Sequence, residues 1–483
     1  MSGIREPYTR SPFYFRRDPR RLRAGSCALT RVSPSDALNR PAGGWNAVPV
    51  VGERGPPPGA KRKRGTGWEG DAAVTAPGAV LILVENLPVP CDRRVWDEAR
   101  ALRNAGTVVS VICPKGRGYT KSYEEIEGIH VYRHALPVEG NDLFGYLIEY
   151  ACALVCQLAL SVKIRRKHGF DVIHACNPPD LMFLIGLIYK VGFRTRFVFD
   201  HHDLSPELYQ VKFGRQGLVH KLLLFLERCS FRTADISLAT NETFRAIAIS
   251  RGRMPATNVW IVRSAPDLTR FRRTQPIIEL RRGRKYLVGY VGVVARQDGL
   301  DVLLHAAQHA VTMRGRSDVQ WLIIGDGPGL DIVRMLANRL CISDFVTFAG
   351  FVVGAQLLSH LSSLDVGVIP DPPNLYNSKV SMNKVFEYMA LGIPFVQFDL
   401  PENTRIAGEA AEVVSRCDAG ALGDAVLDLL DDPGRRAAMA RRARERADVM
   451  FGSNLDGKRL IEAYRSISGS PPDGRIEREG SRP

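Results

Sequence analysis

The sequence predicts an α/β protein with two doubly wound, Rossmann-like halves that face a central cleft. Short apolar runs alternate with segments of helical period, which is typical of parallel sheets covered by helices. The alternation breaks once, in a polar stretch between Arg263 and Lys285, and then restarts. A chain of 483 residues is also too long for one ordinary core. In such folds ligands bind outside the carboxyl ends of the strands.

The first half is expected to span residues 78–265. Its strands are predicted at VLILV, VVSVI, DVIHA, RFVFD, ISLAT and VWIV. Residues 92–104 have the pattern of an amphipathic helix, which Gly106 ends. Its inner face is predicted to consist of Val95, Trp96, Ala99 and Leu102, and its outer face of Arg93, Arg94, Asp97, Arg100 and Arg103.

A linker over 266–284 is expected to lead into a second half over 285–466. Its strands are predicted at KYLVGYVG, QWLIIG, FVTFAG, DVGVI and IPFVQF, and helices over 421–466 close it. One helix lies within SMNKVFEYMALGIP, where Val385 and Met389 face inward. Gly392 fits a left-handed C-cap, and Pro394 stops the helix.

Composition predicts disordered tails at 1–77 and 467–483. Residues 1–78 hold 14 Lys and Arg against 6 Asp and Glu, so +8 of the net charge of +15 lies there. No aromatic stacking platform accompanies the KRKR cluster, so no specific nucleic-acid partner is expected. The nine cysteines form no C-x-x-C pair, and no signal peptide or spanning segment is evident. These features predict a cytoplasmic protein without a metal site.

Two glycine-rich turns and one acidic residue mark the expected site. Gly292 follows the first strand of the second half, and the run Gly325, Asp326 and Gly327 opens a helix. Such turns present N–H groups and a positive helix end, which suit a diphosphate. Glu387 lies in the middle of a largely apolar helix, where an unpaired carboxylate is rare.

Four stretches carry a family resemblance: KVFEYMALGIPFVQFD, IIGDGPG, YVGVVARQDGLDVLLHA and ENLPVPCDRRVWDEARAL. They resemble the GT-B glycosyltransferases of family four, and the chain looks like a divergent bacterial-type member over residues 79–466. The resemblance implies transfer of a sugar from a UDP- or GDP-linked donor, with retention of configuration and without a metal or other cofactor. It implies that Glu387 binds the ribose hydroxyls and that His202 contacts the donor sugar.

The expected site residues fall into three groups. The predicted catalytic residues are His202, Arg296, Lys379 and Lys384. The predicted donor-binding residues are Glu387, Gly292, Gly325, Asp326, Gly327, Ser381 and Met382. The predicted acceptor-side residues are Asn86, Asp92, Arg93 and Arg94. For His202 an alternative is a helix start capped by Asp203 and Ser205, with His201 and His202 both exposed.

Three departures from the family pattern leave alternatives open. Lys379 stands where the family has its first Glu, and Val293 and Asp298 stand where it has the Arg and Lys that grip the donor phosphates. The turn after the first strand reads PCDR instead of Gly-Gly. Either Arg296, Lys379 and Lys384 replace the missing cations, or the chain is a non-catalytic nucleotide-sugar-binding partner subunit. A nucleotide-sugar epimerase on the same fold is the further alternative.

The expected acceptor is a glycan or a polyprenyl-linked intermediate of cell-envelope or exopolysaccharide synthesis. Residues 143–162 are apolar and lead into KIRRKHG, a combination expected for a segment that leans on anionic lipid at the inner face of the membrane. The alternative is a crossover helix packed on the sheet, with a basic end that suits its dipole.

Overall fold

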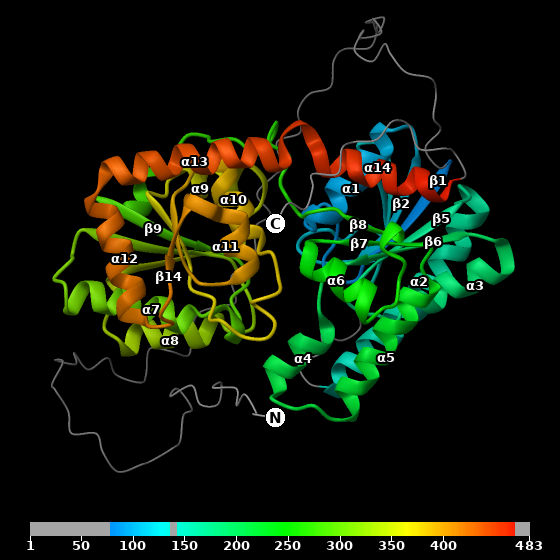
Figure 1. The fold of residues 1–483 in the computed structure, drawn as a ribbon, viewed down its shortest axis with the longest axis horizontal. Coiled ribbons are helices and arrows are strands. Elements are labelled where there is room, and N and C mark those ends of the chain that lie inside the picture. The colour runs from blue at the N-terminus through cyan, green and yellow to red at the C-terminus, as the bar shows by residue number, and fades with distance from the viewer. Residues whose placement is uncertain (1–77, 136–142, 469–483) are drawn as a thin grey trace, which may run out of the picture. The chain divides into compact units, whose positions relative to one another are not determined.

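The computed structural model describes residues 78–135 and 143–468, and by their contacts these belong to one unit. Two sheets form its framework, as the alternating pattern predicts (Figure 1). The tail predicted at 1–77 lies outside the described residues, and so does the tail predicted at 467–483 apart from Ile467, the last residue of a helix, and Ser468, which follows it.

The first sheet has eight strands in the order β3-β4-β2-β1-β5-β6-β7-β8. Its strands are β1 Ala79–Leu83, β2 Val108–Pro114, β3 Tyr123–Ile126, β4 Ile129–His134, β5 Val172–Cys176, β6 Arg196–His201, β7 Ile236–Ala239 and β8 Val259–Ile261. Its helices are α1 Arg93–Asn104, α2 Leu143–Lys167, α3 Phe183–Phe193, α4 Ser205–Phe213, α5 Leu218–Thr233 and α6 Glu242–Ser250. Every strand pair is parallel except β3 with β4.

The antiparallel edge is the first difference from the expected parallel sheet. Strands β3 and β4 are joined at Glu127 and Gly128, which both adopt positive φ, 50° and 77°. Two consecutive residues of this kind build the tight turn that matches the twist of a hairpin. The pair adds two strands that the pattern of apolar runs did not indicate.

The second sheet has six parallel strands in the order β11-β10-β9-β12-β13-β14. Its strands are β9 Tyr286–Val291, β10 Val319–Ile324, β11 Val346–Gly350, β12 Val366–Ile369, β13 Phe395–Phe398 and β14 Ala411–Val414. The helices are α7 Leu300–Thr312, α8 Leu330–Arg339, α9 Gly354–Ser362, α10 Asn383–Leu391, α11 Pro401–Ala407, α12 Ala419–Asp431, α13 Pro433–Phe451 and α14 Leu455–Ile467. Strand β14 was not predicted.

Helix α10 forms as its sequence indicates. Val385 and Met389 are fully buried, and Gly392 caps the helix in the left-handed conformation with φ of 58°. A residue with a side chain at Gly392 would be strained by that backbone. The carboxyl end of α10 is therefore held close to β13, and its amino end points toward the candidate site.

Helix α2 packs on the first sheet as a crossover helix. Ala153, Gln157, Ser161 and Ile164 recur along one face of α2 and are fully buried. Burial of this stripe supports the second alternative given for residues 143–162. Across 78–135 and 143–468, no helix combines the length and the apolar character that crossing a bilayer requires.

Helix α14 corrects the predicted domain boundary. Residues up to 466 were expected to close the second half, but α14 packs on the first, where Leu460 and Ala463 share a core with residues of α1 and β2 (Figure 1). The Tyr464 hydroxyl lies 2.7 Å from Nδ1 of His174 on β5. The last helix therefore belongs to the first half, because its apolar face is complementary to α1.

Replacing Tyr464 with phenylalanine is expected to lower the free energy of unfolding by about 1 kcal/mol. The change removes one buried hydrogen bond to His174 and keeps the ring in place. Chemical denaturation measures it, with Tyr123→Phe as the control, since that hydroxyl bonds at the surface. Equal stability of the two variants would contradict the docking of α14 through this bond.

Candidate functional site

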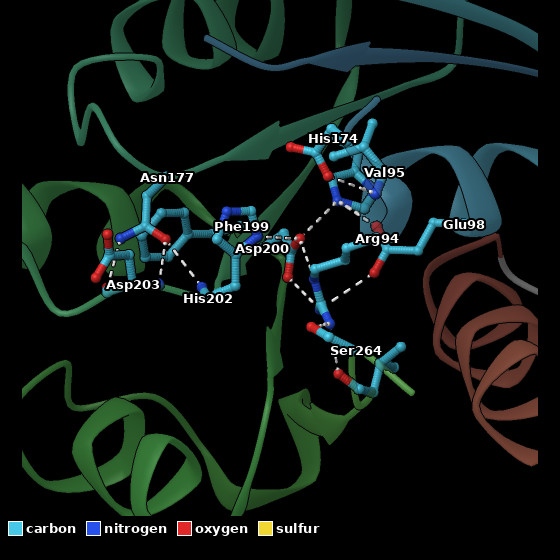
Figure 2. Close-up of polar contacts among 12 residues, drawn as sticks. Arg94, Val95, Glu98, His174, Asn177, Phe199, Asp200, His202, Asp203 and Ser264 are labelled. Atoms are coloured by element: carbon cyan, nitrogen blue, oxygen red, sulfur yellow. Dashed lines mark hydrogen bonds and ion pairs between the residues drawn. The ribbon is translucent and has the colours of Figure 1, made fainter. Parts of the chain in front are cut away.

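His202 lies directly after β6, at the carboxyl end of the first sheet, and is held at two points (Figure 2). Its ring Nδ1 lies 2.9 Å from Oδ2 of Asp200, and its backbone N–H donates to Oδ1 of Asn177 at 2.9 Å. The ring is partly exposed, whereas His201 is fully buried. The alternative in which both histidines are exposed is therefore wrong, and the residue at the start of α4 is Leu204, without a side-chain cap.

Asp200 in turn is held by Arg94 of α1. The guanidinium donates through Nε and Nη2 to the two carboxylate oxygens at 2.9 and 2.6 Å, and through Nη1 to the carbonyl of Val262 and the hydroxyl of Ser264 (Figure 2). This two-pronged pairing fixes both orientation and charge. Arg94 is buried, so its prediction as an outward-facing residue is wrong, and its donors are engaged by Asp200, Val262 and Ser264.

The charges in this cluster follow from burial and pairing. Burial raises the pKa of Asp200, but Arg94 and then His202 outweigh it, so the net pKa lies well below its usual range. Burial lowers the pKa of His202, but the attraction of Asp200 and their hydrogen bond outweigh it, so the net pKa is raised. Burial raises the pKa of Glu98 well above its usual range, despite Arg94. The cluster thus favours ionised Asp200 and protonated His202.

The raised pKa of His202 predicts a pH dependence of stability. A group with a raised pKa in the folded state contributes stability that is fully present below its unfolded pKa of about 6.5 and is lost as pH rises through the folded value. The free energy of unfolding of wild type should therefore decline above a pH of about 6.5, and His202→Gln is expected to remove the share of this decline that His202 causes. Chemical denaturation over a pH series, with His305→Gln on α7 as the control, measures it; identical slopes in both variants would contradict the assignment.

His174, Cys176 and Asp200 bring three potential metal ligands within 4.8 Å of one another. Their chemistry does not fit a cation. Asp200 already accepts hydrogen bonds from Arg94 and His202, and Nδ1 of His174 is engaged with Tyr464. A metal here would also be repelled by the buried guanidinium of Arg94.

Glu387 lies on α10 and meets Arg93 from the first turn of α1. Arg93 Nη1 lies 2.5 Å from Oε1 of Glu387, and its guanidinium also lies over the ring of Phe271, 5.4 Å from the centroid. The Glu387 side chain is 9% exposed and that of Arg93 is 28% exposed. The structure therefore joins a predicted donor-binding residue with a predicted acceptor-side residue, and the carboxylate has the partner that a buried charge needs.

The glycine turns pack against each other. A Cβ at Gly325 would lie 1.8 Å from the carbonyl oxygen of Gly292, and one at Gly327 would lie 2.5 Å from that of Val294. The N–H of Gly292 donates to Ile324, that of Gly325 to Gly350, and that of Gly327 to the carboxylate of Asp326. The N–H groups of these three glycines are therefore already paired, and the glycines permit close backbone contact.

The N-terminus of α10 does offer such groups. Its N-cap, Met382, forms no side-chain cap, and the N–H of Met382 itself donates to Asn403. The next two amides, of Asn383 and Lys384, donate to no group within the described ranges. A helix start of this kind attracts anions through its N–H groups and dipole.

Two of the three cations expected to replace the family pair are already engaged. Nζ of Lys384 lies 2.6 Å from Oδ2 of buried Asp371. Nζ of Lys379 lies 3.0 Å from Oε1 of Glu207 on α4. Arg296 is exposed and forms no ion pair with any residue that the structure describes. The expectation that Lys379 and Lys384 are free to bind donor phosphates is thus not supported by their contacts.

The other expected residues occupy the same region. Ser381 is buried, and its hydroxyl accepts a hydrogen bond from Asn241 of the first half at 2.9 Å. Asp326 pairs with Arg117 at 2.8 Å. Asp92 caps α1 by accepting from the Val95 N–H, and Asn86 is exposed in the loop after β1. The carboxyl ends of both sheets therefore contribute to one site.

Several residues of the site were missed by the sequence analysis. They are Glu98, His174, Asn177, Asp200, Glu207, Asn241 and Asp371. Asn177, Asp200, Asn241 and Asp371 all lie at or just after the carboxyl end of a strand, a position that could have identified them. Glu98 and Glu207 lie on helices, where no sequence signal separates a buried carboxylate from a solvated one.

Known protein families match both halves of the chain. A family model described as "Glycosyl transferase 4-like domain" matches residues 91–264, and one described as "Glycosyl transferases group 1" matches residues 285–432. The sucrose-phosphate synthase of Thermosynechococcus elongatus has a similar fold, with a TM-score of 0.65 and 19% identity over 81% of this chain and 99% of that one.

Two curated relatives match part of the chain. The alpha-D-kanosaminyltransferase of Streptomyces kanamyceticus is 30% identical over 38% of this chain and 46% of its own length. The GDP-mannose-dependent alpha-(1-6)-phosphatidylinositol monomannoside mannosyltransferase of Mycolicibacterium smegmatis is 31% identical over 34% of this chain and 44% of its own length. The chain thus spans about half the length of these relatives. Since family models match both of its halves, the chain belongs to the GT-B glycosyltransferases of family four.

Proposed function

We propose that the protein transfers a sugar from a nucleoside diphosphate-sugar to a glycan or lipid-linked acceptor, with retention of configuration and without a metal. The observation that carries this proposal is the meeting of Glu387 and Arg93 beside the uncapped N-terminus of α10. A carboxylate that accepts from two adjacent hydroxyls and N–H groups that receive an anion are what a nucleoside diphosphate requires.

In this proposal Arg93 binds the donor phosphates in place of the family's Arg and Lys, which this chain lacks. Glu387 turns to the ribose when the donor binds, and the guanidinium that it releases pairs with the diphosphate at the start of α10. The leaving diphosphate gains negative charge as the glycosidic bond breaks, and prearranged donors at that place stabilise the transition state. His202, held by Asp200, presents its free ring nitrogen to the sugar.

The acceptor class is proposed from the name of one relative. The Mycolicibacterium relative is named for a GDP-mannose donor and a phosphatidylinositol monomannoside acceptor. A lipid-linked acceptor in envelope or exopolysaccharide synthesis, met at the inner face of a membrane, is consistent with that name. A GDP-linked donor is proposed for this chain on the same ground, with a UDP-linked donor as the alternative that the family resemblance implies.

A transfer assay with the purified full chain tests the proposal. UDP- and GDP-sugars are supplied with glycan and polyprenyl-phosphate acceptors, and release of nucleoside diphosphate is followed together with the anomeric configuration of the product. Acceptor-dependent release with retention is expected. Donor binding without turnover over the whole panel would show a binding homologue instead, and conversion of the donor into its epimer would show an epimerase.

A further inference from the structure

The outer faces of α3 and α5 expose large apolar side chains. On α5, Leu218, Leu222 and Phe225 recur at helical spacing and are 84%, 48% and 59% exposed. On α3, Val191 is 78% exposed, and the others are Leu187, Ile188 and Phe193. Single exposed apolar residues are ordinary, but a group on neighbouring helices marks an interaction surface.

The two helices are neighbours and meet at the last turns of α5, beyond its exposed apolar residues. They contact each other, and Tyr189 of α3 and Phe231 of α5 share the core on this side of the first sheet. Nζ of Lys190 donates to the carbonyl of Thr233 at 2.7 Å, which ties the end of α3 to the end of α5. We call the outer faces of α3 and α5, with the segment 212–217 that leads from the end of α4 into α5, the α3–α5 surface.

The charges on this surface have one sign. Residues 183–194 and 212–233 contain a single acidic residue, Glu227, which is buried and bound to Arg251. The exposed cations of the same segments are Arg194, Lys212, Arg215, Lys221, Arg228 and Arg232. No carboxylate of these segments therefore reaches solvent to compensate them.

We propose that the α3–α5 surface docks on an anionic lipid bilayer. Protruding Leu and Phe side chains enter the boundary between headgroups and acyl chains, while Lys and Arg around them pair with anionic headgroups. Binding of a nucleic acid through its phosphates would not account for the exposed apolar side chains. A protein partner is disfavoured because the centre of a protein interface is typically depleted of Lys. The surface differs from residues 143–162, whose buried stripe is already covered by the sheet.

This proposal is drawn from the surface alone and does not require that the chain transfer a sugar. If the acceptor is lipid-linked, docking would bring the protein to it. Failure of the transfer assay would leave the docking intact, and loss of docking would leave binding of a nucleoside diphosphate intact. The two proposals can therefore fail separately.

Vesicle flotation with the full chain tests the docking. Vesicles of phosphatidylcholine with phosphatidylglycerol are compared with vesicles of phosphatidylcholine alone, and wild type is expected to bind the anionic vesicles more tightly. Leu218→Ser/Leu222→Ser/Phe225→Ser is expected to weaken that binding by at least about tenfold. The matched control, Ile332→Ser/Met335→Ser/Val449→Ser, changes three exposed apolar residues of the second half and is expected to bind as wild type does.

A second variant tests the charges without touching the apolar residues. Arg215→Gln/Lys221→Gln/Arg228→Gln is expected to weaken binding to anionic vesicles by roughly a hundredfold, since each cation near an anionic surface contributes about 1 kcal/mol. Its control is Arg314→Gln/Arg441→Gln/Arg442→Gln, three exposed cations of the second half. The basic cluster KRKR is present in all four variants, so its contribution cancels in each comparison.

Four results would overturn the proposal. Wild type could bind neither kind of vesicle, or bind both equally. The controls could lose as much binding as the variants. Wild type could also be a dimer by light scattering that binds no vesicles and dissociates in the Leu218 variant, which would make the surface an interface between two copies. A thermal unfolding midpoint equal to that of wild type confirms that each variant is folded.

Discussion

Asp200→Asn is expected to destabilise the protein by about 3–5 kcal/mol, because it leaves the buried guanidinium of Arg94 without its counter-charge. Both oxygens of Asp200 accept from Arg94, and Asp200 is fully buried. The asparagine keeps the shape of the side chain but removes the charge, and its amide would place N–H donors against Arg94 or His202. Glu98 also lies 3.1 Å from Arg94 Nη2, but burial raises the pKa of its carboxyl well above the usual range.

Denaturant unfolding of wild type and variant at neutral pH measures this loss. Asp431→Asn is the matched control, because Asp431 pairs with Arg316 at 2.8 Å but is 61% exposed. Exposed pairs contribute about 0–1 kcal/mol, so the control should change little. Equal effects of the two substitutions would contradict the buried ion cluster. The ring of His202 should also titrate at lower pH in Asp200→Asn, which NMR of the histidine protons detects.

The fold was predictable because its strands are buried on both faces. The five strands named for the second half, such as the fully buried β9 and β10, were recognised from continuous apolar runs. The hairpin of β3 and β4 was missed because β3, YEEI, is exposed at the sheet edge and reads as polar chain. Helix α14 was placed in the wrong half because an apolar face predicts that a helix packs against the protein but does not identify the element it packs against.

The site was less predictable, because pairing decides what a charged residue does. The position of Glu387 on a buried helix was correct, but its partner Arg93 is 294 positions away. Arg94 lies next to Arg93 and was given the same role, yet one helix step turns it inward to Asp200. The spacing of residues in the sequence predicts which of them share a helix face. It does not predict the contact of Lys379 with Glu207, because that contact depends on how two segments distant in sequence pack together.

Glu387→Ala is expected to weaken the binding of UDP or GDP by roughly 10- to 100-fold, because a hydrogen bond to a charged group contributes about 1.5–3 kcal/mol. This prediction rests on the proposed contact of Glu387 with the ribose. The same loss is therefore expected for the nucleosides uridine or guanosine, which carry the ribose without the phosphates. Calorimetry with each nucleotide and nucleoside measures both losses.

Arg93→Ala distinguishes a contact with the diphosphate from a contact with the ribose. If the guanidinium pairs with the diphosphate, the variant should bind the nucleoside diphosphates more weakly and the nucleosides no more weakly than wild type. If Arg93 only restrains Glu387, its loss should free the carboxylate and tighten both, which would contradict its proposed part. Glu409→Ala, whose side chain is 77% exposed in the second half, is the control and should bind as wild type does. Because the nucleosides lack the diphosphate, a general loss of folding would weaken both kinds of ligand and cannot imitate the pattern expected for Arg93→Ala.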